Sequence, residues 1–275
     1  MSFYTSLNGL KNAQVDLGVI SHNIANAETT GFKRSRTEFA DIVAGTAFTN
    51  PKMIVGVGAA VEAITQNFSL GPIQQTGSAL DLAVNGDGFF TTRNVITNQT
   101  LFTRNGSMTV DGAGFISDGA GNRLQLFPTD AAGNITSTTP TDALIPATNG
   151  VDVNGNPIEF AGITVRSDGA VTASYADGSN VVIGVVALAS FIAPQGLKQV
   201  GSSNWVTTGI SGAPSFGQPS TGQFGSLLSG TLERSNVDIA EELVGLITAQ
   251  RNFQANAKAI DTSTQITQTV IQLRT

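Results

Sequence analysis

Cysteine is absent from this chain of 275 residues, and histidine and tryptophan occur once each, as His22 and Trp205. Without cysteine the chain can form no disulfide scaffold, no thiolate zinc site and no cysteine nucleophile. The sequence offers no evident triad partner for His22, so we do not expect hydrolysis through that histidine. The interpretation is a protein that is not an enzyme, with no catalytic residue, no cofactor and no metal ligand.

Charge is scarce as well, because Asp, Glu, Lys and Arg make up 12% of the chain, about half of the ~25% usual in soluble domains. The balance is acidic, with a net charge of −6 and a pI near 4.7, which argues against nucleic acid as a partner. No apolar run reaches about 18 residues, so no membrane insertion is expected. The first residues lack a basic segment followed by an apolar core, so we expect no conventional secretory signal.

Glycine and proline divide the chain into three zones. All nine prolines lie between Pro51 and Pro219, and 27 of the 31 glycines lie between Gly45 and Gly230. Because proline breaks helices and glycine weakens them, only the two ends can form long helices. The sequence therefore predicts an α+β protein, in which N- and C-terminal helices form a coiled-coil domain with a central all-β domain between them.

The N-terminal end carries an apolar heptad pattern. Its first seam positions, seven apart, are Phe3, Leu10, Leu17 and Ile24, and the positions three further on are Ser6, Ala13, Ile20 and Ala27. Seven of these eight residues are apolar, which is typical of a coiled-coil seam. Residues 26–31 then supply helix-stop signals, with Gly31 expected in the left-handed conformation.

The C-terminal end mirrors this pattern. Ser235, Asn236 and Asp238 are candidate N-caps, and Glu241 and Glu242 favour the positive end of a helix. The apolar stripe that follows consists of Ile239, Leu243, Leu246, Phe253, Ala257 and Ile260. About 36 helical residues would span about 54 Å, a length usual in coiled coils or bundles.

The middle of the chain indicates short strands and tight turns. The hairpin signals are the pairs at 85–86, 105–106, 111–112, 118–119, 168–169 and 177–178, each Asn-Gly or Asp-Gly. A short helix is predicted over Thr37–Val43. Carboxylate pairs of the glycosidase type are disfavoured, because the aspartates before glycine have a sufficient explanation in turn chemistry.

These observations predict three parts. Residues 1–33 with 232–275 form the terminal-helix domain, 34–73 with 202–231 an extended connecting region, and 74–201 a β-rich outer domain. Val15, Val19, Val244 and Ile247 widen the apolar surface of the helices beyond one seam. Because one partner helix cannot cover that width, we expect the stripes to form an assembly interface with other copies of the chain.

Four motifs resemble the bacterial flagellar axial proteins, the family of hook and rod subunits. They lie at 23–33, 81–90, 103–114 and 235–254, in the order expected for that family. The residues that carry the resemblance are Asn23, Asn26, Gly31, Phe32, Asn85, Gly86, Gly88, Phe89 and Asn236. The matches cover both ends and the middle of the chain, so chance is a poor explanation.

Within this family the resemblance is to hook subunits, through the Phe39-Ala40-Asp41 and Gly222–Gly225 segments and the run at 249–260. It implies a helical homopolymer that acts as a universal joint and transmits torque from motor and rod to filament. It also implies the partners: the distal rod protein, the hook cap, the hook-filament junction protein and the flagellar export apparatus. The implied location is the hook and basal body of the flagellum, outside the cell after export.

Two alternatives stay open. A distal or proximal rod subunit, forming a rigid drive shaft, fits the compact length of the chain better than a hook subunit does. A secreted β-domain adhesin or carbohydrate enzyme with helical ends is the alternative from a different class.

Overall fold

The computed structural model describes residues 2–44, 55–130, 133–151 and 157–272. The chain divides into two compact units. Unit 1 comprises Met1–Ala27, Arg34–Asn67 and Val237–Thr275, and unit 2 comprises Glu28–Lys33 and Phe68–Asn236. Terminal helices around a central β-rich part confirm the predicted α+β class. The predicted division into three parts stays a prediction.

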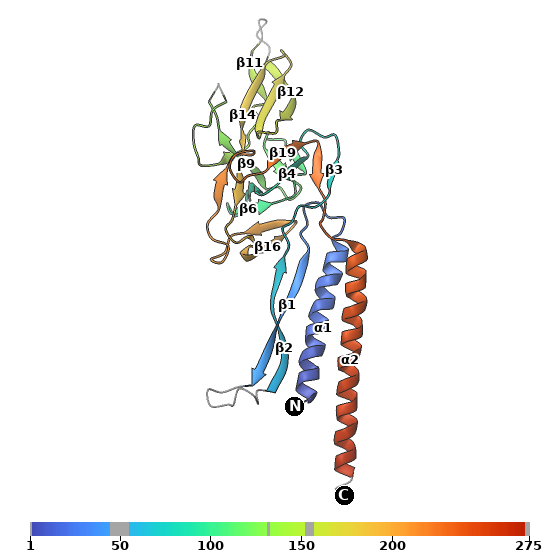
Figure 1. Ribbon diagram of the computed structural model, residues 1–275. Helices are drawn as coiled ribbons and strands as arrows, with labels where there is room; N and C mark the ends of the chain where they lie inside the picture. The colour runs from blue at the N-terminus through green and yellow to red at the C-terminus, as the bar shows by residue number, and fades with distance from the viewer. Residues whose placement is uncertain (1, 45–54, 131–132, 152–156, 273–275) are drawn as a thin grey trace. The chain divides into compact units, whose positions relative to one another are not determined.

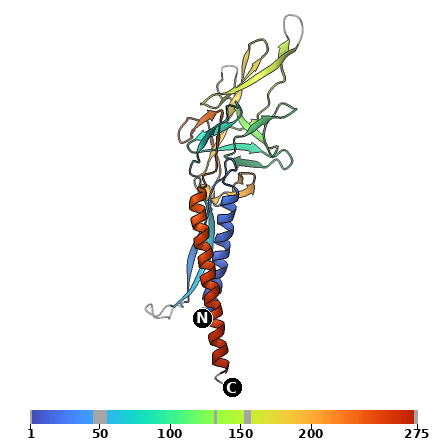
Figure 2. The ribbon, with the colours of Figure 1, turned by 90° about the vertical axis from the view of Figure 1, so that its right-hand side faces the viewer.

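Unit 1 consists of two helices and one hairpin. Helix α1 spans Ser2–Ala25 and α2 spans Ile239–Gln272, close to the two predicted helices. The two helices lie side by side and run in opposite directions (Figures 1 and 2). Within the described residues, neither helix is apolar over a stretch long enough to cross a membrane.

The helix ends follow local signals. Asp238 caps α2, because its Oδ1 accepts hydrogen bonds from the backbone N–H groups of Ala240, at 2.8 Å, and Glu241, at 3.3 Å. At the end of α1, the side-chain amide of Asn26 donates to the carbonyl oxygen of His22 at 2.9 Å. Gly31 has φ of +67°, as predicted for the stop region. Asp238, one of the three predicted caps of α2, thus bonds the first turn.

The short helix predicted over Thr37–Val43 is wrong. That segment lies in strand β1, Ser35–Ala44, which pairs antiparallel with β2, Val55–Gln66. The register shifts between Glu38 and Phe39 and again between Ile42 and Val43. These irregularities disturb the strict alternation of a strand, so the segment lacks the regular pattern by which a strand is recognised in sequence.

Three contacts define how α1 and α2 are aligned. Asn256 lies against Gly9, and the side chain of Glu242 accepts a hydrogen bond from Asn23. Between these two contacts, a Cβ added to Gly245 would lie 3.5 Å from Ile20 Cδ1. The spacing from one contact to the next is the same on both helices. The pair is therefore antiparallel in one constant register, while the knobs-into-holes packing of a coiled coil stays a prediction.

Unit 2 is built from short strands. They are β3 (Ile73–Gln75), β4 (Leu82–Asn85), β5 (Phe89–Arg93), β6 (Thr100–Thr103), β7 (Met108–Val110), β8 (Ile116–Asp118), β9 (Arg123–Pro128), β10 (Thr141–Asp142), β11 (Thr148–Val151), β12 (Pro157–Val165), β13 (Ala170–Tyr175), β14 (Asn180–Val186), β15 (Leu188–Ser190), β16 (Lys198–Gly201), β17 (Asn204–Val206), β18 (Ser215–Gly217), β19 (Ser226–Ser229) and β20 (Thr231–Glu233). A short 3₁₀ helix spans Pro194–Gly196. The longest path through the main sheet runs β11-β12-β13-β14-β9-β5-β6-β17-β16, and β19 pairs with β4 and β20 with β3.

Four of the six predicted hairpin turns are confirmed. The Asp-Gly pairs at 111–112, 118–119, 168–169 and 177–178 connect strands that pair antiparallel, namely β7–β8, β8–β9, β12–β13 and β13–β14. In each turn the aspartate Oδ1 accepts a backbone N–H two residues on. The hairpin turns predicted at 85–86 and 105–106 are wrong. The strands before and after each of these turns do not pair with one another but with other strands.

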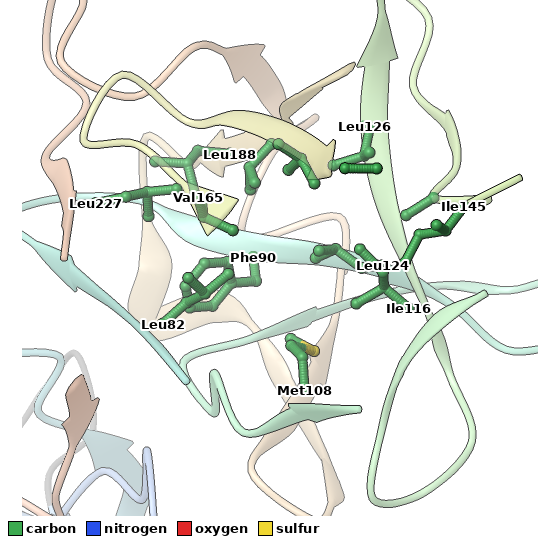
Figure 3. Close-up of a cluster of buried hydrophobic side chains, with 14 of the residues drawn as sticks. Leu82, Phe90, Met108, Ile116, Leu124, Leu126, Ile145, Val165, Leu188 and Leu227 are labelled. Carbon is green, nitrogen blue, oxygen red and sulfur yellow. The ribbon is translucent and has the colours of Figure 1, made fainter. Parts of the chain in front are cut away.

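Two apolar clusters fill unit 2. The larger surrounds Phe90 and includes Leu82, Ile116, Leu124 and Leu188, all fully buried (Figure 3). The smaller is aromatic: Trp205 is completely buried, with edge-to-face contacts to Phe68 and Phe89, and Phe191 contacts Phe89 in the same way. The single tryptophan therefore reports on the folding of unit 2.

Among the described glycines of unit 2, Gly106 is the most tightly packed, since a Cβ added there would lie 1.7 Å from the carbonyl oxygen of Leu82. We expect Gly106→Ala to lower the free energy of unfolding by about 1–3 kcal/mol, because the backbone of β4 must move away. The measurement is urea unfolding followed by Trp205 fluorescence. Gly112→Ala is the control, since its Cβ would meet open space. Equal midpoints for the two variants would contradict the packing described.

Candidate functional site

The hairpin and α2 occupy two adjacent sides of α1. Asn12 donates to the carbonyl oxygen of Ala59 on β2 at 2.8 Å, and Thr5 and Asn8 approach Gly58 of the same strand. At about 100° per residue, the side facing the hairpin lies about 60° from the line of α1 that contacts α2. The first seam positions of α1, Phe3, Leu10, Leu17 and Ile24, lie about 100° away in the other direction, on the side that the hairpin leaves uncovered, whereas Ile20 lies near the line that contacts α2.

The predicted stripe of α2 lies on the same side of the helix pair. Its centre lies about 80° around the axis of α2 from the line that contacts α1. Viewed along each helix from its N-terminus, the rotation from the contact line to the apolar residues has the same direction in α2 as in α1. Because the helices are antiparallel, equal senses of rotation bring both sets together. Phe3 is 41% exposed, Ile239 45% and Leu243 47%. The half-buried members are Leu10, Leu17, Ile20, Ile24, Leu246, Phe253, Ala257 and Ile260. We call these eleven predicted residues the apolar helix face.

A polar cluster ties the three elements of unit 1 together. The side chain of Asn23, which is 1% exposed, bonds the backbone of Ser35 on both sides, donating to its oxygen at 2.8 Å and accepting from its N–H at 2.9 Å. It also donates to Glu242 Oε2 at 3.2 Å, while Arg34 Nε lies 2.6 Å from Glu242 Oε1. An amide is required to serve both groups of Ser35, which explains the Asn at this motif position.

A buried ion cluster lies in unit 2. Glu233 and Lys33 are both fully buried, with Lys33 Nζ 2.5 Å from Glu233 Oε1 and 2.7 Å from the carbonyl oxygen of Ser69. Arg104, 3% exposed, reaches Glu233 Oε2 at 3.4 Å and lies over the Phe89 ring. One carboxylate therefore holds two buried cations from distant parts of the chain.

Both buried cations have a lowered pKa. Desolvation lowers the pKa of Lys33, and the neighbouring Glu233 opposes that shift. Desolvation likewise lowers the pKa of Arg104, against the charges of Glu233 and Asp87. The backbone N–H of Gly71 donates to Glu233 Oε1 at 2.9 Å, so the carboxylate has partners on both oxygens. Removal of Glu233 would leave both cations without their counter-ion.

The other motif residues also bring backbone segments together. Gly31 donates its N–H to the carbonyl oxygen of Glu233 at 2.8 Å, and an added Cβ would lie 2.5 Å from the backbone nitrogen of Asn105. Gly86 has φ of +125° and Gly88 φ of +128°. Asn85 pairs with Ser226 where β4 meets β19, and Phe32 and Phe89 are buried. The side chain of Asn236 donates to the carbonyl oxygen of Ser69.

These contacts give the motifs a structural role. Within the described residues, no three or more His, Asp or Glu side chains lie together in a way that could hold a metal ion. Sequence reasoning placed Lys33, Arg104 and Glu242 inside motifs but missed their pairing, and it missed Glu233 altogether. One signal in the sequence could have indicated these pairs. Charged residues make up only 12% of the chain, so a charged residue beside apolar motif positions is a candidate for a buried ion pair.

Asp142 makes acid stability testable. Its own burial would raise the pKa, but hydrogen bonds from Gln125, Arg93 and Arg123 outweigh burial and hold the pKa of Asp142 below its usual value. A lowered folded pKa stabilises the fold above the unfolded pKa of about 3.9, and this stabilisation disappears as pH falls through the folded pKa. We therefore expect the urea concentration at the unfolding midpoint to decrease as the pH is lowered below about 4. This decrease should be smaller in Asp142→Asn, which has no carboxylate to protonate at this position. The same acid dependence in both proteins would contradict this role.

Three parts of the chain match families of flagellar proteins. Residues 3–33 match the family described as flagella basal body rod protein, residues 83–173 the D1 domain of flagellar hook protein FlgE/F/G, and residues 228–273 the C-terminal part of flagellar basal body rod FlgEFG protein. The first and third matches contain α1 and α2, and the second contains much of unit 2.

Curated relatives extend the match over the whole chain. Flagellar basal-body rod protein FlgG of Bacillus subtilis (strain 168) is 35% identical over 289 residues, covering 99% of this chain and 98% of that protein. The FlgG protein of Borreliella burgdorferi is 31% identical over 279 residues, covering 95% and 94%. Flagellar hook protein FlgE of Escherichia coli (strain K12) is 26% identical over 410 residues, covering 100% of both.

The chain thus combines two terminal helices with a β-rich part, and the motif residues make contacts within the chain. The chain belongs to the family of flagellar rod and hook proteins. It is accordingly a component of the flagellum and a structural protein, since its relatives are rod and hook proteins and not enzymes.

Proposed function

We propose that this chain is a subunit of the flagellar rod, the alternative that the compact length left open, and not of the hook. The observation that carries the proposal is how the relatives align. The rod protein of Bacillus subtilis matches 289 positions at 35% identity, whereas the hook protein of Escherichia coli needs 410 positions to match a chain of 275 residues at 26%. The hook protein thus carries long segments for which this chain has no counterpart.

The proposed rod is a helical homopolymer with the helices at its core. The apolar helix face supports this part, because it lies on the side of the helix pair that the hairpin does not cover and is partly exposed in one copy. We propose that helices of neighbouring copies cover it in coiled-coil fashion. In the same proposal, residues 34–73 with 202–231 form the extended connecting region and residues 74–201 form the β-rich outer domain. We further propose that the chain is exported through the flagellar channel.

The test locates the protein in isolated flagellar bases. Antibodies against the chain, carrying gold particles, should label the straight rod in electron micrographs of purified hook–basal bodies. A strain that lacks the gene should then carry neither complete rods nor hooks, because a hook assembles on a finished rod. Labelling of the curved segment, or complete rods without hooks in the deletion strain, would overturn the proposal in favour of the hook.

A further inference from the structure

The chain enters and leaves the larger part of unit 2 through two neighbouring segments. Residues 68–85 lead in and include β3 and β4, and residues 226–236 lead out and include β19 and β20. We call them the entry arm and the exit arm. β20 pairs antiparallel with β3, and β19 pairs antiparallel with β4. Because the pairing is antiparallel, the beginning of the entry arm and the end of the exit arm lie at the same end of the paired strands.

This arrangement makes the paired arms weak against tension between their ends. A force that pulls the two ends apart acts first on the backbone contact nearest to them, where the N–H of Arg234 donates to the carbonyl oxygen of Pro72 at 2.9 Å. It then acts on the strand pairs in order, beginning with Glu233 and Ile73. The arms would therefore open one pair at a time, unless another group holds them together at this end.

Lys33 is positioned to hold both arms. It belongs to neither of them, because it ends the separate segment Glu28–Lys33 of unit 2. Its Nζ donates to the carbonyl oxygen of Ser69 on the entry arm at 2.7 Å, and it lies 2.5 Å from Glu233 Oε1 on the exit arm. The side chains of Lys33 and Glu233 are fully buried. One buried ammonium group thus bonds both arms at the end where tension between them would act.

Two further hydrogen bonds join the arms at the same place. The side-chain amide of Asn236 donates to the oxygen of Ser69 that also accepts from Lys33, at 3.1 Å. The backbone N–H of Gly71 on the entry arm donates to Glu233 Oε1 at 2.9 Å. The end of the first segment, the beginning of the entry arm and the end of the exit arm therefore meet at one carbonyl oxygen.

We propose that Lys33 is a mechanical latch, which keeps the entry and exit arms together when the connections between unit 2 and the rest of the chain are under tension. The latch goes beyond the proposed function, because it would serve a rod subunit and a hook subunit alike. To separate the arms, tension has to pull Lys33 from Ser69 or from Glu233. Separating the buried ion pair leaves a charge without its partner in a site that excludes water, which makes this step costly.

Single-molecule pulling tests the latch directly. Since the chain has no cysteine, Leu70→Cys and Arg234→Cys provide the only two attachment points for DNA handles, one on each arm. Leu70 is 41% exposed and the side chain of Arg234 40% exposed. At constant force, we expect Lys33→Met to raise the unfolding rate of unit 2 at least about a hundredfold. Lys198→Met, the same change at an exposed position on β16, should alter that rate by less than about threefold.

A second pair of handles separates the latch from a general effect on stability. Gly112→Cys and Ala161→Cys lie at exposed positions, and tension between them passes through β8, β9, β14, β13 and β12 of the main sheet. The arms are not loaded in this geometry, so the contacts of Lys33 are still intact when the sheet gives way. Contacts that are intact in the transition state leave the unfolding rate nearly unchanged, so Lys33→Met should then change the rate by no more than about threefold.

Two results would overturn the latch: no faster unfolding of Lys33→Met with handles on the arms, or an equal acceleration with both pairs of handles. Asn236→Ala is the variant to use if Lys33→Met does not fold, because it removes a single contact at the same oxygen of Ser69. It should speed unfolding about tenfold with handles on the arms, and equal rates with both pairs of handles would again contradict the latch. Gold label on the curved hook would overturn the proposed function alone, since the latch lies within one chain.

Discussion

Glu233→Gln should lower the free energy of unfolding of unit 2 by about 3–5 kcal/mol, the usual result of removing one partner from a buried ion pair. The substituted side chain has nearly the same shape, so the change removes charge and leaves packing in place. Among the described residues, it leaves Lys33 and Arg104 buried with no anion near either cation, apart from Asp87 beside Arg104. Their desolvation is then uncompensated.

The measurement is urea unfolding followed by the fluorescence of Trp205, which is completely buried in the aromatic cluster of the same unit. Glu159→Gln provides the matched control, because Glu159 is exposed on β12 and the substitution is the same. We expect that control to change the free energy of unfolding by no more than about 0.5 kcal/mol. Circular dichroism of the helices distinguishes loss of unit 2 from loss of the whole fold.

A second substitution tests whether charge is the cause. Lys33→Met added to Glu233→Gln removes one of the two uncompensated cations, so the double variant should be more stable than Glu233→Gln alone. Such non-additivity is expected for residues that share one ion cluster. A Glu233→Gln protein within about 1 kcal/mol of the unchanged chain, or a double variant that loses the sum of both single effects, would contradict the role assigned to this carboxylate.

Much of the fold could be predicted because the decisive signals are local. The confinement of proline and most glycine to the middle left two helical ends, and both helices are present with nearly the predicted bounds. Asp-Gly turns were recognised where the aspartate side chain bonds the turn itself, as Asp111 and Asp177 do. Gly31 was predicted left-handed from the stop signals around it, and its φ is positive.

The failures concern contacts between distant residues. Asn85 and Asn105 stand before glycine as hairpin asparagines do, yet the strands after them pair elsewhere, which no local pattern reveals. Lys33 and Glu233 are 200 residues apart, so their pairing could not be predicted from spacing. The alignment of α1 with α2 could not be predicted for the same reason, because the close approach at Gly9 depends on Asn256, a residue of the other helix.

Leu17→Asp and Phe253→Asp should each abolish assembly while leaving the subunit folded. Both side chains belong to the apolar helix face and are half-buried in a single copy. If neighbouring copies cover that face, each substitution buries an unpaired carboxylate, at a cost of several kcal/mol, in every subunit of the polymer. The same charge in a dilute single copy can stay in water. A strain expressing either variant should therefore be non-motile and lack rods.

Ala255→Asp is the control for these two substitutions. It introduces the same charge two residues from Phe253, at an exposed position on the opposite side of α2. Strains with this variant should swim and contain normal rods in electron micrographs, and all three purified variants should match the unchanged protein in the circular dichroism of the helices. Normal rods from Leu17→Asp or Phe253→Asp would place those side chains in solvent within the polymer and contradict assembly through the apolar helix face. Loss of rods in Ala255→Asp as well would show that added charge, and not its position, prevents assembly.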